Sequence, residues 1–265
     1  MPQIYIMAVI TLTVSLFLWA GLTYLFNGHQ KQYFWLLFLG LPLSAAANLL
    51  LKPQVISVVG SAAHVQPGLG LAAPIWFLAF KVLATPVIEE AIKVLPLLLM
   101  PAWRMVTSRA NALWVGFVLG ISFGLGEAGF IAYAVAQNDA YNSLPWYAFT
   151  GFLNERIMTC FAHGVMTAVL VIGLYRGGWS ILYGYLMAMG LHLFLNAPTV
   201  MYQVKWISYK LYNMSLVIPF IVLAVIFERM RRVARESKDD QGCKEIVYWK
   251  REAADAKHSS LPIQE

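Results

Sequence analysis

The sequence predicts an all-α protein, a polytopic transmembrane helical bundle of about seven transmembrane helices. Of its 265 residues, 60% are hydrophobic and only 12% are charged, which leaves too little polar surface to cover a water-soluble globule of this size. Apolar runs of about 20 residues recur along the chain, and each is long enough to cross a hydrocarbon core about 30 Å thick. Hydrocarbon does not tolerate open sheet edges, and these runs lack the alternation of an outer-membrane barrel.

Seven apolar segments are expected, at about 4–26, 33–51, 72–100, 111–136, 154–175, 180–201 and 207–227. The first is a transmembrane helix rather than a signal peptide, because no Lys or Arg precedes it and it exceeds the usual length of a signal-peptide core. The third is longer than a bilayer requires. Lys81 and Pro86 predict that 70–80 lies along the outer interface or enters at a slant and that 82–100 crosses. The aromatic and polar stretch 137–153 is typical of an interfacial or re-entrant segment on the outer face.

These segments predict a single transmembrane domain over 1–228 and a polar cytoplasmic tail over 229–265. From Glu228 onward, a short amphipathic helix followed by disorder is expected. Positive residues in short loops set the orientation. They are Lys31, Arg104, Arg109, Arg176, Arg229, Arg231, Arg232 and Arg235. With seven crossings they share the cytoplasmic side, so the N-terminus is expected outside and the C-terminus inside, although Lys205 and Lys210 fall on the opposite side.

The net charge of +6 is explained by these loops and the C-terminal cluster, so membrane lipids are expected as partners and no nucleic acid is. Cys160 and Cys243 are too few for a disulfide framework and have no metal-ligand spacing.

Nearly all other hydrophilic groups inside the spans fall into four short clusters. These are Glu89, Glu90 and Lys93 in EEAIK, Glu127 in FGLGE, His163 and Thr167 in HGVMT, and His192 and Asn196 in HLFLN. A charge near the bilayer centre costs about 2.5–3.5 kcal/mol, so three unpaired carboxylates would cost on the order of 10 kcal/mol. Structural contacts between helices are the alternative explanation, but it is a weaker one for three glutamates and two histidines than for Ser, Thr or Asn.

Helical spacing predicts that these side chains converge, because residues three, four or seven apart share a face. A stripe of glycines ends near Glu127, and similar stripes of small or polar residues contain His163 and His192. These stripes are Gly116, Gly120 and Gly124, then Arg156, Thr159, His163 and Thr167, then Gly184, Ala188, His192 and Asn196. If 82–100 crosses the membrane, all these carboxylates and imidazoles lie near the midpoints of their helices. We therefore expect one cavity in the middle or outer half of the membrane, with a catalytic core over about 80–200.

Such a cavity suits peptide hydrolysis without a nucleophilic Ser or Cys. A carboxylate can take a proton from water, and an imidazole can hold that water or stabilise the oxyanion, as can the amide of Asn196. One of Glu89 and Glu90 is expected to face the water while Lys93 neutralises the other. Arg156 is expected either to pair with a carboxylate or a substrate carbonyl, or to be an ordinary interfacial arginine.

Two other functions fit the same residues. Buried Glu and His chains also serve as proton relays in proton-coupled transporters, but the chain lacks repeat symmetry and paired broken helices. A catalytically silent membrane binding or immunity protein could also keep such a fold, and a closed, dry cavity would favour that function.

The four motifs Glu-Glu-x-x-Lys (89–93), Phe-x-x-x-Glu (123–127), His-x-x-x-Thr (163–167) and His-x-x-x-Asn (192–196) together resemble the PrsW-type intramembrane proteases. That family is grouped with the CAAX prenyl endopeptidases and the bacteriocin-processing membrane enzymes. The resemblance implies proteolysis within or beside a bacterial or archaeal cell membrane. It also implies a membrane-anchored protein substrate, such as an anti-sigma-factor-like single-pass protein.

The resemblance further implies roles for individual residues. Glu89 would activate water with Glu90 as its partner, while His163, His192 and Asn196 would hold the water and the oxyanion. Glu127 occupies the place of a histidine in the CAAX endopeptidases, so its role and that of His163 stay open. Lys93, Arg156 and Thr167 would support the site. We prefer a metal-free mechanism without a cofactor; the alternative is zinc bound by Glu127, His163 and His192, although no His-Glu-x-x-His motif is present.

Overall fold

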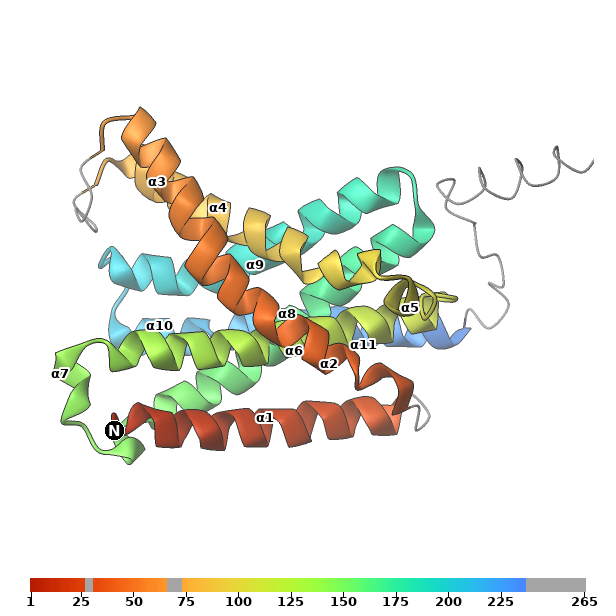
Figure 1. The fold of residues 1–265 in the computed structure, drawn as a ribbon, viewed down its shortest axis with the longest axis horizontal. Helices are drawn as coiled ribbons and strands as arrows, with labels where there is room; N and C mark the ends of the chain where they lie inside the picture. The colour runs from red at the N-terminus through yellow and green to blue at the C-terminus, as the bar shows by residue number, and fades with distance from the viewer. Residues whose placement is uncertain (27–30, 66–72, 237–265) are drawn as a thin grey trace, which may run out of the picture.

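The computed structural model describes residues 1–26, 31–65 and 73–236. This part of the chain is helical and contains no strand (Figure 1). The main helices are α1 (Ile4–Phe26), α2 (Leu36–Ala45), α3 (Lys52–Ala62), α4 (Ile75–Lys93), α6 (Arg109–Ala136), α8 (Thr150–Arg176), α9 (Trp179–Gln203) and α11 (Val217–Glu236). The short ones are η1 (Lys31–Tyr33), the π-helix η2 (Ala46–Leu51), η4 (Leu95–Leu98), α5 (Met100–Trp103), α7 (Asp139–Asn142), η5 (Trp146–Phe149) and α10 (Tyr209–Ser215).

Six helical stretches are long and apolar enough to cross a membrane, which confirms the predicted polytopic helical bundle. They are Ile4–Phe26, Lys31–Ala62, Arg109–Ala136, Trp146–Arg176, Trp179–Gln203 and Tyr209–Glu236. The remaining expected segment is α4, which carries four charged side chains in 19 residues. The architecture is therefore consistent with the predicted count of about seven helices.

The third apolar segment differs from its prediction. Helix α4 runs from Ile75 through Lys81 and Pro86 without a break and ends at Lys93, so 82–100 is not one crossing helix. The chain continues as η4 and α5, each with a proline in its first turn, because Pro96 and Pro101 have no N–H to extend the helix. The glutamates thus lie near the C-terminal end of α4, not at the midpoint of a helix. Residues 70–72 of this prediction lie outside the described residues.

The end of the bundle also differs from its prediction. No separate amphipathic helix starts at Glu228, since α11 continues unbroken to Glu236. Glu228 pairs with Arg231 and Arg232, three and four residues ahead, at 2.7 Å each, and such pairs support an exposed helical turn. The predicted disorder from residue 237 onward falls outside the described residues.

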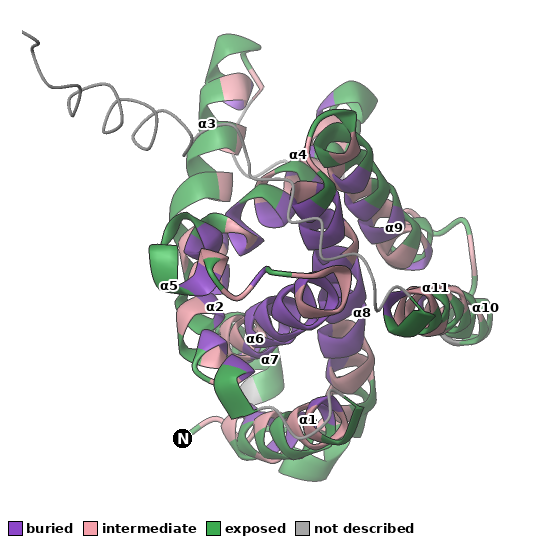
Figure 2. Cartoon of the chain, turned by 90° about the vertical axis from the view of Figure 1, so that its right-hand side faces the viewer, coloured by how far each residue is buried: buried purple, intermediate pink, exposed green. Residues whose placement is uncertain are grey.

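Helices α6 and α8 form the buried centre of the molecule (Figure 2). The predicted glycine stripe lies at their contact. A Cβ on Gly116 would lie 2.6 Å from Cα of Ala168, and one on Gly124 would lie 2.7 Å from Cα of Cys160. This face of α6 therefore packs tightly on α8, and the close approach fixes the depth of His163 on α8 relative to Glu127 on α6.

The other helices pack around this pair. Helix α1 contacts both, with Trp19 Nε1 donating to the Ile157 carbonyl at 3.0 Å, while α2 packs on α6 and α9 on α8. Helix α4 lies against α9, where the Tyr185 hydroxyl donates to the carbonyl of Val87 at 2.7 Å. This arrangement brings the charged end of α4 next to the polar face of α9.

Candidate active site

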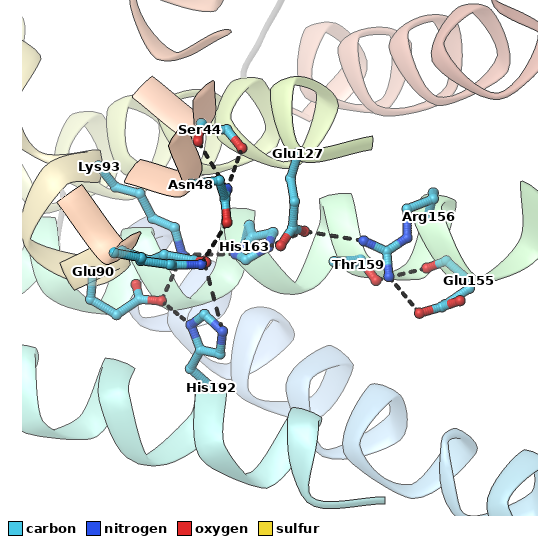
Figure 3. Close-up of polar contacts among 12 residues, drawn as sticks. Ser44, Asn48, Glu90, Lys93, Glu127, Glu155, Arg156, Thr159, His163 and His192 are labelled. Atoms are coloured by element: carbon cyan, nitrogen blue, oxygen red, sulfur yellow. Dashed lines mark hydrogen bonds and ion pairs between the residues drawn. The ribbon is translucent and has the colours of Figure 1, made fainter. Parts of the chain in front are cut away.

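The charged and imidazole side chains predicted from the sequence converge from four helices (Figure 3). Helix α4 supplies Glu89, Glu90 and Lys93, α6 supplies Glu127, α8 supplies His163, and α9 supplies His192. Apart from the partly accessible Glu127, all of these side chains are buried. Because the motifs lie on helices that pack side by side, their convergence follows from the helix contacts.

Glu90 is held by a cation and an imidazole. Lys93 Nζ donates to Glu90 Oε1 at 2.6 Å, and His192 Nδ1 lies 2.6 Å from the same oxygen. A carboxylate accepts hydrogen bonds, so Nδ1 of His192 carries a proton in this contact and Nε2 of a neutral ring is left as an acceptor. Lys93 therefore neutralises Glu90, as expected for one of the two glutamates.

Glu89 has a different partner, Lys52 at the start of α3. Lys52 contacts Glu89 Oε1 and donates to Asn48 Oδ1 at 2.8 Å. The second carboxylate oxygen, Oε2, is buried, has no hydrogen-bond partner and lies 3.8 Å from His192 Nε2. Glu89 thus presents a buried oxygen that accepts no hydrogen bond, next to the unprotonated nitrogen of His192.

His163 is fixed by contacts on both ring nitrogens. Its Nδ1 lies 2.7 Å from Lys93 Nζ, and its Nε2 lies 3.1 Å from Glu127 Oε2. An ammonium only donates, so Nδ1 accepts and Nε2 carries the proton toward Glu127. Phe123, the first residue of the Phe-x-x-x-Glu motif, packs its ring edge-on against His163 and under the Lys93 ammonium.

Arg156 pairs with carboxylates. Its guanidinium lies 3.2 Å from Glu127 and also contacts Glu155. The residue is only 7% exposed, which excludes an ordinary interfacial arginine. Of the alternatives expected for Arg156, pairing with a carboxylate is therefore the one observed.

A cavity of about 190 Å³ adjoins the polar cluster. Glu127, His163, His192 and Asn196 line it from the side of the cluster, whereas Glu89 and Glu90 do not reach its surface. The other lining residues are Ile131, Glu155, Arg156, Met158, Thr159, Leu195, Thr199 and Leu216. Asn196 thus lies at the cavity wall together with His163 and His192.

Thr167 does not join the cluster. It is buried on α8 with its hydroxyl unpaired, and its main-chain oxygen lies at the Gly116 contact between α6 and α8. Its place one turn beyond His163 fits a packing position.

The sequence prediction missed Lys52 and Asn48. Asn48 lies in the π-helix η2, where its amide donates to the Ser44 carbonyl at 2.9 Å while its oxygen receives Lys52. Single-turn π-helices occur mostly inside α-helices at functional sites. Asn48 could have been found from the sequence, because it is a polar residue inside an apolar run. Lys52 could not, because it lies just past the expected end of that run.

The donor set fits a zinc-type ion in part. Ligand atoms of Glu89, His163 and His192 lie within 4.8 Å of one another, and two histidines with one glutamate form a known zinc ligand set. Glu90 would then orient His192 from behind, as carboxylates do for zinc-bound histidines. This set contains Glu89 in place of the Glu127 expected from the sequence. His163 would have to release one of its two contacts to bind an ion.

Comparisons with known proteins agree with the motifs. Neither the comparison with curated proteins nor that with solved structures gave a match. A family model described as "PrsW family intramembrane metalloprotease" matches residues 29–226, which include every helix that contributes to the cluster. The kinship with CAAX and bacteriocin-processing enzymes stays a prediction. Since the match covers most of the chain, the protein belongs to the PrsW family of intramembrane proteases.

Proposed function

We propose that the protein is an endopeptidase that hydrolyses a peptide bond of a membrane-anchored protein with a water molecule activated by Glu89. The observation that carries this proposal is the unbonded oxygen of Glu89, buried 3.8 Å from His192 Nε2. Two acceptors form no hydrogen bond with each other, but at this separation they can share one water, which donates a proton to each. The oxygen lone pair of that water is then free to attack.

In the proposed reaction, the water oxygen attacks the carbonyl carbon of the substrate and Glu89 takes the proton that the water loses. The carbonyl oxygen becomes the oxyanion of a tetrahedral intermediate. When the carbon–nitrogen bond breaks, protonated Glu89 gives its proton to the leaving amine nitrogen, so the carboxylate is restored. Glu90 acts as a positioning residue, because its contact with Nδ1 sets the tautomer of His192.

The oxyanion needs donors that face the cavity. Asn196, one turn beyond His192 on α9, lines the cavity and supplies a neutral amide N–H. The positive charges of Lys93 and Arg156 lie in the same water-poor region, where charge stabilisation is stronger than in bulk water.

A metal-free mechanism is the preferred proposal. If an ion were bound by Glu89, His163 and His192, it would polarise the substrate carbonyl and lower the pKa of a bound water. However, the ammonium groups of Lys52 and Lys93 contact Glu89 and His163, two of the three proposed ligands, and would repel a divalent cation.

The proposed substrate is a single-pass membrane protein, such as an anti-sigma-factor-like protein, cut within or beside the membrane. Family membership supports a protein substrate in the bilayer. The cavity also has both polar and apolar walls: the proposed catalytic residues line one part, and Ile131, Met158, Leu195 and Leu216 line another. A substrate segment that moves out of the lipid could place its apolar side chains against the second part. The presence of this cavity argues against a catalytically silent protein with a closed, dry site.

The test uses purified protein reconstituted with solubilised membrane proteins, whose new N-termini are identified by mass spectrometry. Glu89→Gln keeps the shape of the side chain but cannot accept the proton, so cleavage should fall by about 10²–10⁴-fold. Glu90→Gln should also reduce it, whereas Glu236→Gln, an exposed carboxylate at the end of α11, should leave it unchanged. Full cleavage by both Glu89→Gln and Glu90→Gln would rule the proposal out.

Metal content measured on the same preparations separates the two mechanisms. Full activity with far less than one zinc per chain supports the metal-free mechanism. One zinc per chain that is lost in His163→Ala and His192→Ala, together with the activity, supports the alternative.

A further inference from the structure

A second cavity lies away from the catalytic cluster, between α8, α9 and α11, and has a volume of about 540 Å³. Its walls come from the last two turns of α8, the first turns of α9 and the C-terminal half of α11, together with the first residue of α6. These parts lie at the end of the bundle that also contains α5 (Figure 1). The proposed protease mechanism makes no use of this cavity.

The mouth of this cavity is basic. Arg109, Arg176 and Arg229 all line it, and no carboxylate does among the described residues. Arg176 and Arg229 form no ion pair with a carboxylate of the described chain. The guanidinium groups of Arg176 and Arg229, with Arg109 beside them, make a site for an anionic group, because planar guanidinium groups bind phosphate oxygens in pairs.

Two helix N-termini add to this positive field. Helix α6 begins at Arg109 and α9 at Trp179, and Ser180 in the first turn of α9 lines the cavity. Exposed N–H groups and the helix dipole favour an anion at such positions.

The rest of the cavity wall is apolar. It is lined by Val169, Ile172, Met187, Ile226, Met230 and Val233. Val169 lies seven residues from Arg176 along α8, or about 10 Å toward the middle of the bundle. Gly173 and Gly184 also line the cavity where α8 and α9 cross closely, with a Cβ on Gly173 lying 3.2 Å from Cα of Gly184. Tyr183, 68% exposed, stands on the same face of α9, as aromatic residues do at headgroup level.

We propose that this cavity binds one anionic phospholipid. Its phosphate would lie among Arg109, Arg176 and Arg229, and the first part of an acyl chain would lie in the apolar groove along α8 and α11. A zwitterionic lipid presents the same phosphate but adds an ammonium group that three guanidinium groups repel. Basic pockets between transmembrane helices bind anionic headgroups elsewhere. The bound lipid would fill the space between α9 and α11.

The test is native mass spectrometry of the detergent-purified full chain after incubation with phosphatidylglycerol or phosphatidylcholine. The wild-type protein should retain one phosphatidylglycerol at activation energies that remove phosphatidylcholine. The double substitution Arg176→Gln/Arg229→Gln should weaken phosphatidylglycerol binding about tenfold or more. The matched control is Arg104→Gln/Arg235→Gln, which removes the same charge from exposed arginines at the same end of the bundle.

Three outcomes would overturn the proposal. Equal retention in the two double variants would show that overall charge, and not this cavity, binds the lipid. Equal retention of phosphatidylcholine would contradict the choice of an anionic lipid. Displacement of the lipid by millimolar inorganic phosphate would show that the apolar groove contributes nothing. Ile226→Trp, which fills the groove without changing the charge, should lower retention even if the arginine variants fold poorly.

Discussion

Each carboxylate of the cluster pairs with a cation. Glu89 pairs with Lys52, Glu90 with Lys93 and Glu127 with Arg156. An unpaired charge in the membrane costs about 2.5–3.5 kcal/mol, so this pairing explains how three glutamates are tolerated among apolar helices. The pairing still leaves one oxygen of Glu89 and one of Glu90 without a hydrogen bond.

Removal of Lys52 should impair catalysis more than folding. In Lys52→Met, the Glu89 carboxylate loses the cation that holds it in place, so its free oxygen is no longer fixed beside His192 for the shared water. We expect kcat to fall by about 10²-fold while KM changes little, and Lys52→Arg to restore most of the rate. The measurement is steady-state cleavage of a substrate peptide in proteoliposomes.

The matched control for Lys52 is Lys81→Met. Lys81 lies on α4 about 12 Å before Glu89 by helix rise and has no ion pair with a described carboxylate. Its substitution should leave kcat unchanged. If Lys52→Met keeps the full rate, or if Lys52→Arg is as slow as Lys52→Met, the positioning role of Lys52 is wrong.

At the scale of helices, apolar run length predicts the helices well but their ends poorly. The run 33–51 covers only part of the helical stretch Lys31–Ala62, because helix hydrogen bonds continue past the polar side chains that end the run. The long run 72–100 shows the opposite case. There the side chains stay apolar while Pro96 and Pro101 interrupt the α-helical hydrogen bonds.

Which residues form the site was largely predictable from the sequence, but which carboxylate pairs with which cation was not. Glu89, Glu90, Glu127, His163 and His192 stand out because charged and imidazole groups are rare in apolar runs. Which glutamate meets which lysine depends on helix rotation and on α3, a helix outside the expected catalytic core. Thr167 shares a helix face with His163 but belongs to the packing between α6 and α8, a distinction that spacing alone does not make.

The contact between α6 and α8 should be intolerant of even one methyl group. A Cβ on Gly120 would overlap the main chain of His163 and Gly164, so Gly120→Ala must push α8 away and move His163 from Glu127. Overpacking of this kind costs about 1–3 kcal/mol. We expect a lower melting temperature and strongly reduced cleavage, measured by a thermal scan in detergent and by the proteoliposome assay.

Gly129 on the same helix provides the control, since a Cβ there meets nothing within 4 Å. Alanine is a better helix former than glycine by about 1 kcal/mol, so Gly129→Ala should be neutral or stabilising. Similar losses in the two variants would show that the close helix contact at Gly120 is not the cause of the effect.

For the whole molecule, the distribution of charge over the two ends of the bundle supports the predicted orientation. The N-terminus, α7 and α10 lie at one end, and α5, the α8–α9 turn and the end of α11 lie at the other (Figure 1). The second end carries Arg104, Arg109, Arg176 and the arginines of α11, as a cytoplasmic end should. We therefore propose that the N-terminus lies outside and the C-terminus in the cytoplasm.

This orientation is testable by labelling single cysteines with a membrane-impermeant maleimide in a Cys243→Ser background, where Cys160 is buried. Ser143→Cys, in the exposed segment after α7, should react in intact cells. Trp179→Cys, at a position 77% exposed in the α8–α9 turn, should react only in inverted vesicles. The background protein without an added cysteine should stay unlabelled in both preparations, which controls for Cys160. The reverse pattern would place the arginine-rich end outside, and the lipid cavity between α8, α9 and α11 would then face the outer leaflet.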